Sequence, residues 1–201
     1  MSLFFAVVGC AGGIMLGRLV RFAILGRRVT PSAADAERPK EDSVFAGMPC
    51  NLGDVVVRRV EGDEAWLAGA LVFFEDRPVG ALFVAPEARH DLAVLAREAR
   101  VELAWLLPTS GGEGPVGRDP PSAIEHEGVR FDRTRRTPVR VERVGTGAPS
   151  VGATAIVAEY AGPGIERYVV VAGTDATLAW RGVALTEHDY DVLPSGRTTL
   201  E

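Results

Sequence analysis

Two stretches of this chain follow the same pattern, and that repetition limits the possible fold more than any other feature of the sequence. Both begin with Val-Gly-Ala, contain a Val-Ala pair and end on Leu-Ala-Trp. They cover residues 79–105 and 151–180. We interpret the pattern as an internal duplication. The alternative is a single β-meander whose apolar strands happen to be similar.

The repeat decides how an ambiguous segment should fold. Alone, residues 86–100 have the alanine and leucine spacing of a helix. Their counterpart, residues 166–172, is rich in valine and bounded by glycines, which is typical of a strand. We therefore predict a strand over residues 92–96, with a short helix as the alternative. The other predicted strands are residues 54–60, 66–75, 79–85, 101–107, 129–133, 139–144, 153–160, 166–172, 176–180 and 183–186.

The predicted fold class is mainly β, with two similar small antiparallel β modules after an N-terminal transmembrane helix. The modules either stay separate or close together into one barrel. The predicted boundaries are residues 1–30 for an anchor with a basic flank, 31–50 for a flexible linker, 51–108 for the first module, 109–121 for a Gly/Pro-rich linker, 122–196 for the second module and 197–201 for a tail.

The first thirty residues have the composition of a membrane anchor. Sixteen consecutive uncharged residues, 2–17, precede Arg18, Arg21, Arg27 and Arg28. As a helix the uncharged run spans about 24 Å, against about 30 Å of bilayer hydrocarbon, and the first arginines can extend toward the headgroups to complete the crossing. We expect residues 3–25 to contact the membrane. A cleaved signal peptide, a buried helix, or a lipoprotein acylated at Cys10 are the alternatives.

The charge distribution predicts the orientation of this anchor. Residues 1–30 carry four arginines and no acid, whereas the remaining residues hold 18 basic and 27 acidic side chains. Because positive flanks stay in the cytoplasm, we expect a single-pass protein of the cytoplasmic membrane with its N-terminus outside and its C-terminal domain inside. An envelope lipoprotein is the alternative. The acidic body argues against a nucleic-acid partner.

A search for catalytic or metal-binding motifs finds none. His90, His126 and His188 lie far apart in the sequence, and Cys50 lacks the local signature of a nucleophile. The loop at 145–150 breaks the dinucleotide-binding pattern. We therefore predict no catalytic residue, metal or cofactor. The tryptophans that end the two repeats are expected in the core at equivalent positions.

One concentrated feature remains, an arginine-rich segment in the second module. Alternating apolar residues around it predict that most of the arginines lie on the outer face of a hairpin. They form a candidate docking patch for an anionic partner, which is an acidic lipid, an acidic protein surface or a phosphate ligand. The alternative is an ordinary solvated strand face. The patch comprises Arg130, Arg133, Arg135, Arg136, Arg140 and Arg143.

Several short motifs carry a family resemblance over residues 51–194. They are a Gly53-Asp54 turn before an early strand, a strand ending in Glu159-Tyr160, and a late strand starting at Gly182-Val183. With these motifs the chain resembles the bacterial domain-of-unknown-function family numbered four-one-seven-eight. The resemblance implies a β-rich domain of unknown biochemical role, sometimes found beside membrane or envelope-stress proteins, with no established catalytic residues. The arginine-rich segment and the anchor depart from that pattern.

These observations favour a membrane-anchored, non-enzymatic adaptor or assembly module. The alternative is a small-ligand-binding protein or an enzyme whose site lies between the two β modules.

Overall fold

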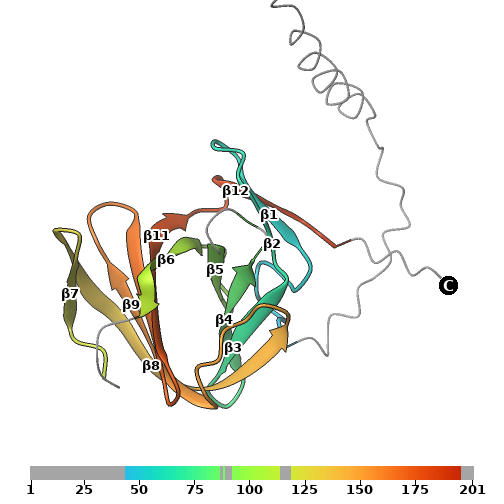
Figure 1. Cartoon of the computed structure of the whole chain (residues 1–201). Coiled ribbons are helices and arrows are strands. Elements are labelled where there is room, and N and C mark those ends of the chain that lie inside the picture. The colour runs from blue at the N-terminus through green and yellow to red at the C-terminus, as the bar shows by residue number, and fades with distance from the viewer. Residues whose placement is uncertain (1–43, 87, 89–91, 114–118, 196–201) are drawn as a thin grey trace, which may run out of the picture. The chain divides into compact units, whose positions relative to one another are not determined.

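The computed structural model describes residues 44–86, 88, 92–113 and 119–195, which form twelve strands and no helix. Eight strands form a closed antiparallel barrel in the order β3-β4-β5-β6-β11-β10-β9-β8, and β8 pairs back onto β3. Figure 1 shows these strands arranged in a ring. They are β3 (Gly69–Phe74), β4 (Pro78–Ala85), β5 (Leu92–Arg97), β6 (Leu103–Glu113), β8 (Val129–Gly145), β9 (Thr154–Ala161), β10 (Glu166–Gly173) and β11 (Thr177–Leu185).

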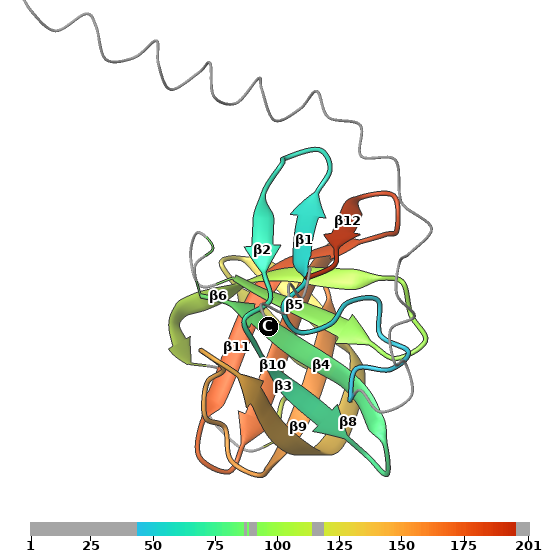
Figure 2. The ribbon, with the colours of Figure 1, turned by 90° about the vertical axis from the view of Figure 1, so that its right-hand side faces the viewer.

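Four further strands lie outside the barrel. In a three-stranded sheet, β1 (Val55–Arg58) pairs with both β2 (Glu64–Trp66) and β12 (Tyr190–Leu193). This sheet lies beside the barrel in both Figure 1 and Figure 2. The fourth strand, β7 (Ala123–His126), pairs with the first residues of β8.

Alternation of side chains along the strands builds separate apolar layers. Every barrel strand contributes to one cluster, which therefore fills the barrel interior; its large members include Phe73, Leu82, Leu95, Val171 and Trp180. A second cluster lies between the outer wall of the first four barrel strands and the small sheet, and includes Val56, Phe83 and Trp105. A third covers the outer wall of the other half, around Phe131, Tyr160 and Tyr168.

The prediction of a mainly β, antiparallel and barrel-like fold is confirmed for the described residues. The strands of the two predicted modules form a single closed barrel, because β6 pairs with β11 and β3 pairs with β8. Each half is a four-stranded meander, β3–β6 and β8–β11, so the two halves have the same strand order. The strand predicted over residues 92–96 is confirmed as β5, and the helical alternative is wrong.

The two repeat tryptophans correct one detail of the duplication. Both are buried, and each lies on the last strand of its half, Trp105 on β6 and Trp180 on β11. However, Trp105 faces the outer cluster, whereas Trp180 points into the barrel. Their predicted equivalence is therefore wrong, because a one-residue difference in register moves a strand side chain to the other face.

Several predicted boundaries also change. Residues 44–50, assigned to the flexible linker, place Phe45, Met48 and Cys50 in the core. Strand β6 continues to Glu113, inside the predicted Gly/Pro-rich linker. Two predicted pairs of strands are continuous, since 129–133 and 139–144 both belong to β8, and 176–180 and 183–186 overlap β11.

The predicted membrane contact at residues 3–25 and most of the linker lie outside the described residues. Among the residues that are described, no helix is long and apolar enough to cross a bilayer.

Candidate functional site

One end of the barrel contains a buried arginine. Arg97 is the last residue of β5 and follows Ala93 and Leu95 on the face that points into the barrel. Only 4% of its side chain is exposed, and its guanidinium carbon lies 6.0 Å from the centre of the Phe73 ring. Nη2 of Arg97 donates a hydrogen bond to the carboxylate of Glu159 on β9. An arginine–glutamate ion pair therefore closes this end of the apolar interior.

A glycine on the neighbouring strand makes room for this arginine. Gly80 of β4 pairs directly with Arg97. A Cβ atom on Gly80 would lie 2.9 Å from Cδ and 3.0 Å from Nη1 of Arg97. Such contacts are too close for a real side chain, so residue 80 must be glycine for Arg97 to keep its present position.

Further charged residues surround the pair at this end of the barrel. Nε of Arg135 lies 4.0 Å from Oε1 of Glu159, and Nη2 of Arg167 lies 3.5 Å from Oε1 of Glu102. Together with Arg97 and Arg100, these groups make four arginines against two glutamates, a formal charge of +2. We call these six residues, Arg97, Arg100, Glu102, Arg135, Glu159 and Arg167, the charged end of the barrel. Both halves of the barrel contribute to it.

Burial and the neighbouring charges shift the pKa of Arg97. Burial lowers the pKa of its guanidinium, Glu159 raises it, and the like charges of Arg135 and Arg100 lower it further. Two of its nitrogens, Nε and Nη1, are buried and have no hydrogen-bond partner among the described residues. An unpaired buried donor costs about 1–3 kcal/mol, more when charged. Arg97 is therefore a costly side chain for the barrel to retain.

The cavity at the charged end is small and partly open to solvent. It has a volume of about 30 Å³ and is lined by apolar residues of β5, β6 and β10 together with Arg97, Arg100, Glu102, Glu159, Tyr160, Arg167 and Tyr168. One water molecule occupies about 30 Å³ of liquid, whereas pockets for drug-sized ligands measure about 300–1,000 Å³. The cavity has room for water, whereas an organic substrate does not fit inside it.

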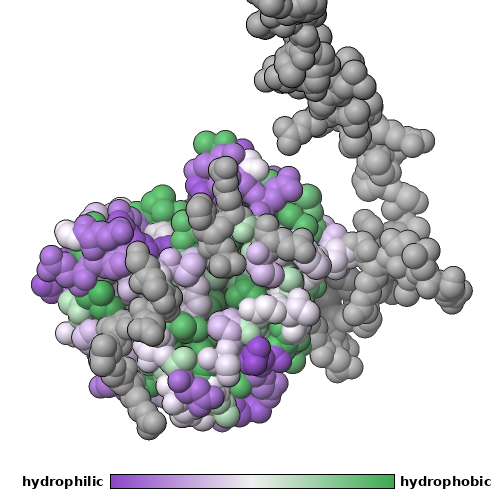
Figure 3. Space-filling model, viewed as in Figure 1, coloured by the Kyte–Doolittle hydropathy of each residue, from purple (hydrophilic) through white to green (hydrophobic). Residues whose placement is uncertain are grey.

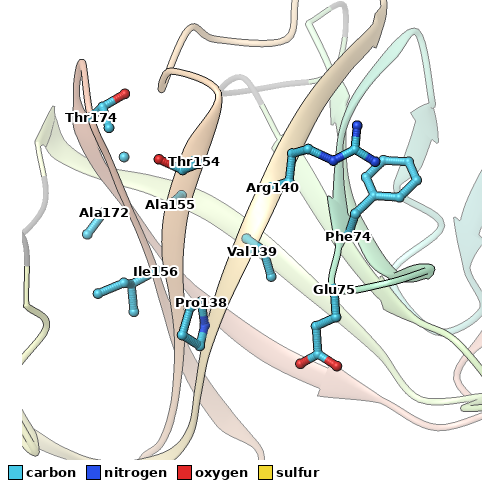
Figure 4. A pocket seen from close by; sticks show the side chains of 11 residues that line it. Phe74, Glu75, Pro138, Val139, Arg140, Thr154, Ala155, Ile156, Ala172 and Thr174 are labelled. Carbon is cyan, nitrogen blue, oxygen red and sulfur yellow. The ribbon is translucent and has the colours of Figure 1, made fainter.

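A second concave region lies elsewhere on the barrel and is much larger. It is an open groove of about 670 Å³ across β8, β9 and the end of β10, beside the β3–β4 turn. Figure 4 shows Phe74, Glu75 and Arg140 on one side of it, Thr154, Ile156, Ala172 and Thr174 on the other, and Pro138 with Val139 between them. The Arg140 guanidinium stacks 4.7 Å from the centre of the Phe74 ring.

The groove borders a part of β8 that has no strand on one side. Residues 140–145 of β8 pair with β3, and residues 129–132 pair with β7. Between these stretches the strand pairs only with β9. Pro138 and exposed Arg136 lie on this open stretch, and both residue types hinder the addition of another strand. A partner bound at the groove would therefore use side-chain contacts.

The six arginines predicted as a docking patch lie on one continuous strand, β8, on which Arg133 and Arg135 are half-buried and the other four are exposed. A bulge between Arg133 and Arg135 changes the side-chain alternation along β8. Arg135 consequently turns toward the charged end of the barrel, while Arg136 stays exposed. In Figure 3, hydrophilic residues gather over β7 and the adjoining part of β8.

Acidic side chains or backbone carbonyls already hold most of these arginines. Arg130 bonds Asp132 at 2.9 Å, and Arg136 bonds Asp119 at 3.0 Å. Arg140 bonds Glu142 at 2.6 Å. Two others use carbonyl oxygens: Arg133 donates to that of Pro120, and Arg143 to that of Ala148. The structure does not gather the six side chains into one free cationic surface.

The other sequence candidates have local roles. Cys50 is buried, and burial together with the negative charge of Asp54 raises the pKa of its thiol to about 12, far from that of a nucleophile. His126 packs against Tyr168, His188 lies in the exposed loop before β12, and His90 is outside the described residues. No group of three His, Cys, Asp or Glu side chains in the described part of the chain could hold a metal ion.

Sequence reasoning missed Arg97 and did not assign Glu159 to a site. The signal for Arg97 was available: the predicted strand 92–96 ended one residue early, and its alternation places residue 97 on the same face as Ala93 and Leu95. Glu159 belongs to one of the motifs quoted for the family resemblance, but its partner is 62 residues away in the sequence.

Comparisons with known proteins add no relative: no family model matches the chain, and searches of curated proteins and of solved structures find no match.

Proposed function

We propose that the chain is a membrane-anchored, non-enzymatic adaptor whose β-barrel docks a partner protein in the open groove. The observation that carries this proposal is the contrast between the two concave regions. The cavity at the charged end holds about 30 Å³, whereas the open groove offers about 670 Å³. An enzyme needs a site that surrounds its substrate, and a partner protein needs an accessible surface.

The chemistry of the groove indicates the kind of partner segment. Its apolar floor includes Pro138, Ile156 and Ala172, and its margins carry the hydroxyl of Thr154 and the guanidinium of Arg140. This mixture suits an apolar side chain of a partner, flanked by hydrogen-bonding groups. The membrane anchor at residues 3–25, with the barrel in the cytoplasm, belongs to the same proposal.

Family membership is also part of the proposal, because the resemblance to family four-one-seven-eight rests on motifs alone. One of those motifs fastens two chain segments. Asp54 is buried, and its carboxylate accepts backbone hydrogen bonds from Asn51 at 2.8 Å and from Ser195 at 3.0 Å. Gly53 before it adopts a φ of +87°, which favours glycine.

Site-specific photocrosslinking in cells tests the docking surface. A photoreactive amino acid is placed at Ile156 in the groove, and the matched control is placed at Ile165, which is 60% exposed on the β9–β10 turn. We expect a discrete adduct from position 156 only, and its loss when Thr154→Arg, at an exposed position of the groove, fills it. Equal adducts from both positions, or none from position 156, would contradict the proposal.

A further inference from the structure

We propose that the outer face of the three-stranded sheet is a second docking surface, which binds a basic, apolar segment of a partner protein. This surface is separate from the groove, and the proposal goes beyond the adaptor function without depending on it. It rests on an exposed apolar row, on a neighbouring row of carboxylates and on the excess negative charge of the sheet. Figure 2 shows the three strands β2, β1 and β12 side by side.

The two faces of this sheet differ in what they contact. On the inner face, Val56 and Ala65 are fully buried in the cluster that also contains Trp105. Side chains alternate along a strand, so Val55 and Trp66 point to the opposite, outer face. Neither of these two residues belongs to any of the three apolar clusters. The inner face therefore packs against the barrel, while the outer face takes no part in the described core.

A row of apolar side chains crosses the outer face. Val55 of β1 pairs with Leu193 of β12 on one side and with Trp66 of β2 on the other. Directly paired residues lie on the same face with their Cβ atoms about 4.5–5.5 Å apart, so the three side chains form one continuous row. Leu193 is 52% exposed and Trp66 is 45% exposed. Single exposed apolar residues are common, whereas a continuous row that includes a tryptophan is typical of a contact surface.

A row of carboxylates lies beside the apolar row. Val57 pairs with Asp191 on β12 and with Glu64 on β2, two residues along the strands and therefore about 7 Å from the apolar row. Arg59 already holds Asp191, to which its Nε and Nη2 donate hydrogen bonds of 3.1 Å and 2.7 Å. Glu64 is exposed and has no cation among the described residues. Its carboxylate is therefore open to a guanidinium or ammonium group of a partner.

The charge of the sheet selects the occupant. Residues 55–66 and 186–193 contain two arginines and six acidic residues, a formal charge of −4. This charge opposes contact with an anionic lipid surface, and it opposes the stacking of two copies of this chain through the same face. A basic segment is complementary to it, and an apolar side chain of that segment covers the row at Trp66. The occupant is therefore a protein segment in which arginine or lysine neighbours an apolar residue.

Site-specific photocrosslinking of the full-length protein in cells tests this surface. A photoreactive amino acid replaces Leu193, and the matched control replaces Val101, which is 58% exposed between β5 and β6. We expect an adduct from position 193 only, attached to a segment with arginine or lysine within three residues of the crosslinked site. Glu64→Lys should abolish this adduct. Glu125→Lys is the matched control, because Glu125 on β7 is also exposed and has no ion pair among the described residues.

A synthetic peptide of the crosslinked segment then measures the affinity for full-length protein in phosphatidylcholine nanodiscs, with empty nanodiscs as the blank. Glu64→Lys should weaken binding about tenfold or more, because it places like charges together. Trp66→Ser should weaken binding about thirtyfold, because it removes the aromatic anchor. A peptide whose basic residues are replaced by glutamate should bind Glu64→Lys protein more tightly than wild type. Misfolding of the variant cannot produce that gain.

Several results would overturn the proposal. They are no adduct from position 193, equal adducts from positions 193 and 101, or an adduct to lipid, to an acidic segment or to another residue of this chain, including a second copy. An affinity unchanged by Glu64→Lys would also overturn it. The groove adduct from position 156 is measured in Glu64→Lys protein in parallel, so that each docking surface can fail separately.

Discussion

Removing the two partners of the buried ion pair should have unequal effects on stability. Glu159→Gln leaves a charged Arg97 that is 4% exposed, with only a neutral amide beside it. Breaking a buried pair by removing one partner costs about 3–5 kcal/mol. Because the glutamine oxygen can still accept a hydrogen bond and Glu159 is 21% exposed, we expect about 2–3 kcal/mol for this variant.

Arg97→Met should cost less, although it removes the more deeply buried side chain. Methionine takes away the charge and both unpaired donors, and each of those donors costs about 1–3 kcal/mol in the wild type. Glu159 keeps Arg135 as a cation 4.0 Å away. We therefore expect a loss of about 1 kcal/mol or less. In the Arg97→Met background, Glu159→Gln should cost only about 0–1 kcal/mol, which gives a coupling of about 2 kcal/mol.

Urea unfolding followed by tryptophan fluorescence measures all four members of this cycle. Trp105 and Trp180 are buried and report the loss of the core. The control cycle uses the exposed pair Arg77 and Glu98, for which we expect a coupling below about 0.5 kcal/mol. If Arg97→Met costs as much as Glu159→Gln, or if the two effects add within about 0.5 kcal/mol, the reasoning about the unpaired donors is refuted.

Three further predictions concern other parts of the chain. Folding raises the pKa of the Cys50 thiol from 9.0 to about 12, so the thiol stays protonated in the fold at a pH where the unfolded thiol ionises. The stability that this contributes is fully present below pH 9 and is lost by about 1.4 kcal/mol per pH unit between pH 9 and 12. Cys50→Ala should therefore flatten the pH dependence of the urea-unfolding free energy between about pH 8 and 10. Gly182→Ala should destabilise the barrel by about 3 kcal/mol, because its Cβ would lie 1.8 Å from the Trp105 carbonyl oxygen. Gly164→Ala has open space around its Cβ and should cost only about 1–2 kcal/mol; thermal unfolding compares the two variants. For the predicted topology, a fluorescent protein fused after Glu201 should mark the membrane and protease added to spheroplasts should spare the barrel; digestion of the barrel would support the lipoprotein alternative.

The strand content of the barrel could be predicted from composition and repetition, but strand continuity could not. The polar residues 134–138 end the apolar alternation of β8, so the sequence indicates two strands there. Strand β8 is continuous through these residues for two reasons. A bulge after Arg133 shifts the side-chain alternation, and Pro138 lies where β8 has no neighbouring strand on one side. Neither feature has a local sequence signature.

The charged end was harder to predict, because it depends on register between distant strands. The repeat suggested that the two halves belong together, but it could not place Arg97 opposite Glu159, since each strand pairing adds its own shift. Trp105 and Trp180 show how sensitive the placement is: a shift of one residue along a strand moves a side chain from the barrel interior to the outer wall. Residue types were therefore predictable, whereas the side chains that meet inside the barrel were not.

The charged end forms only when the barrel is closed, because its residues come from both halves. Arg97, Arg100 and Glu102 come from the first half, and Arg135, Glu159 and Arg167 come from the second. The ion pair between Arg97 and Glu159, and the one between Glu102 and Arg167, therefore form only when the two meanders have joined. A separated first half would leave Arg97 without the carboxylate of Glu159, and a separated second half would leave Arg167 without that of Glu102. Arg97, whose burial costs stability by itself, is thereby paired with Glu159 only in the closed barrel.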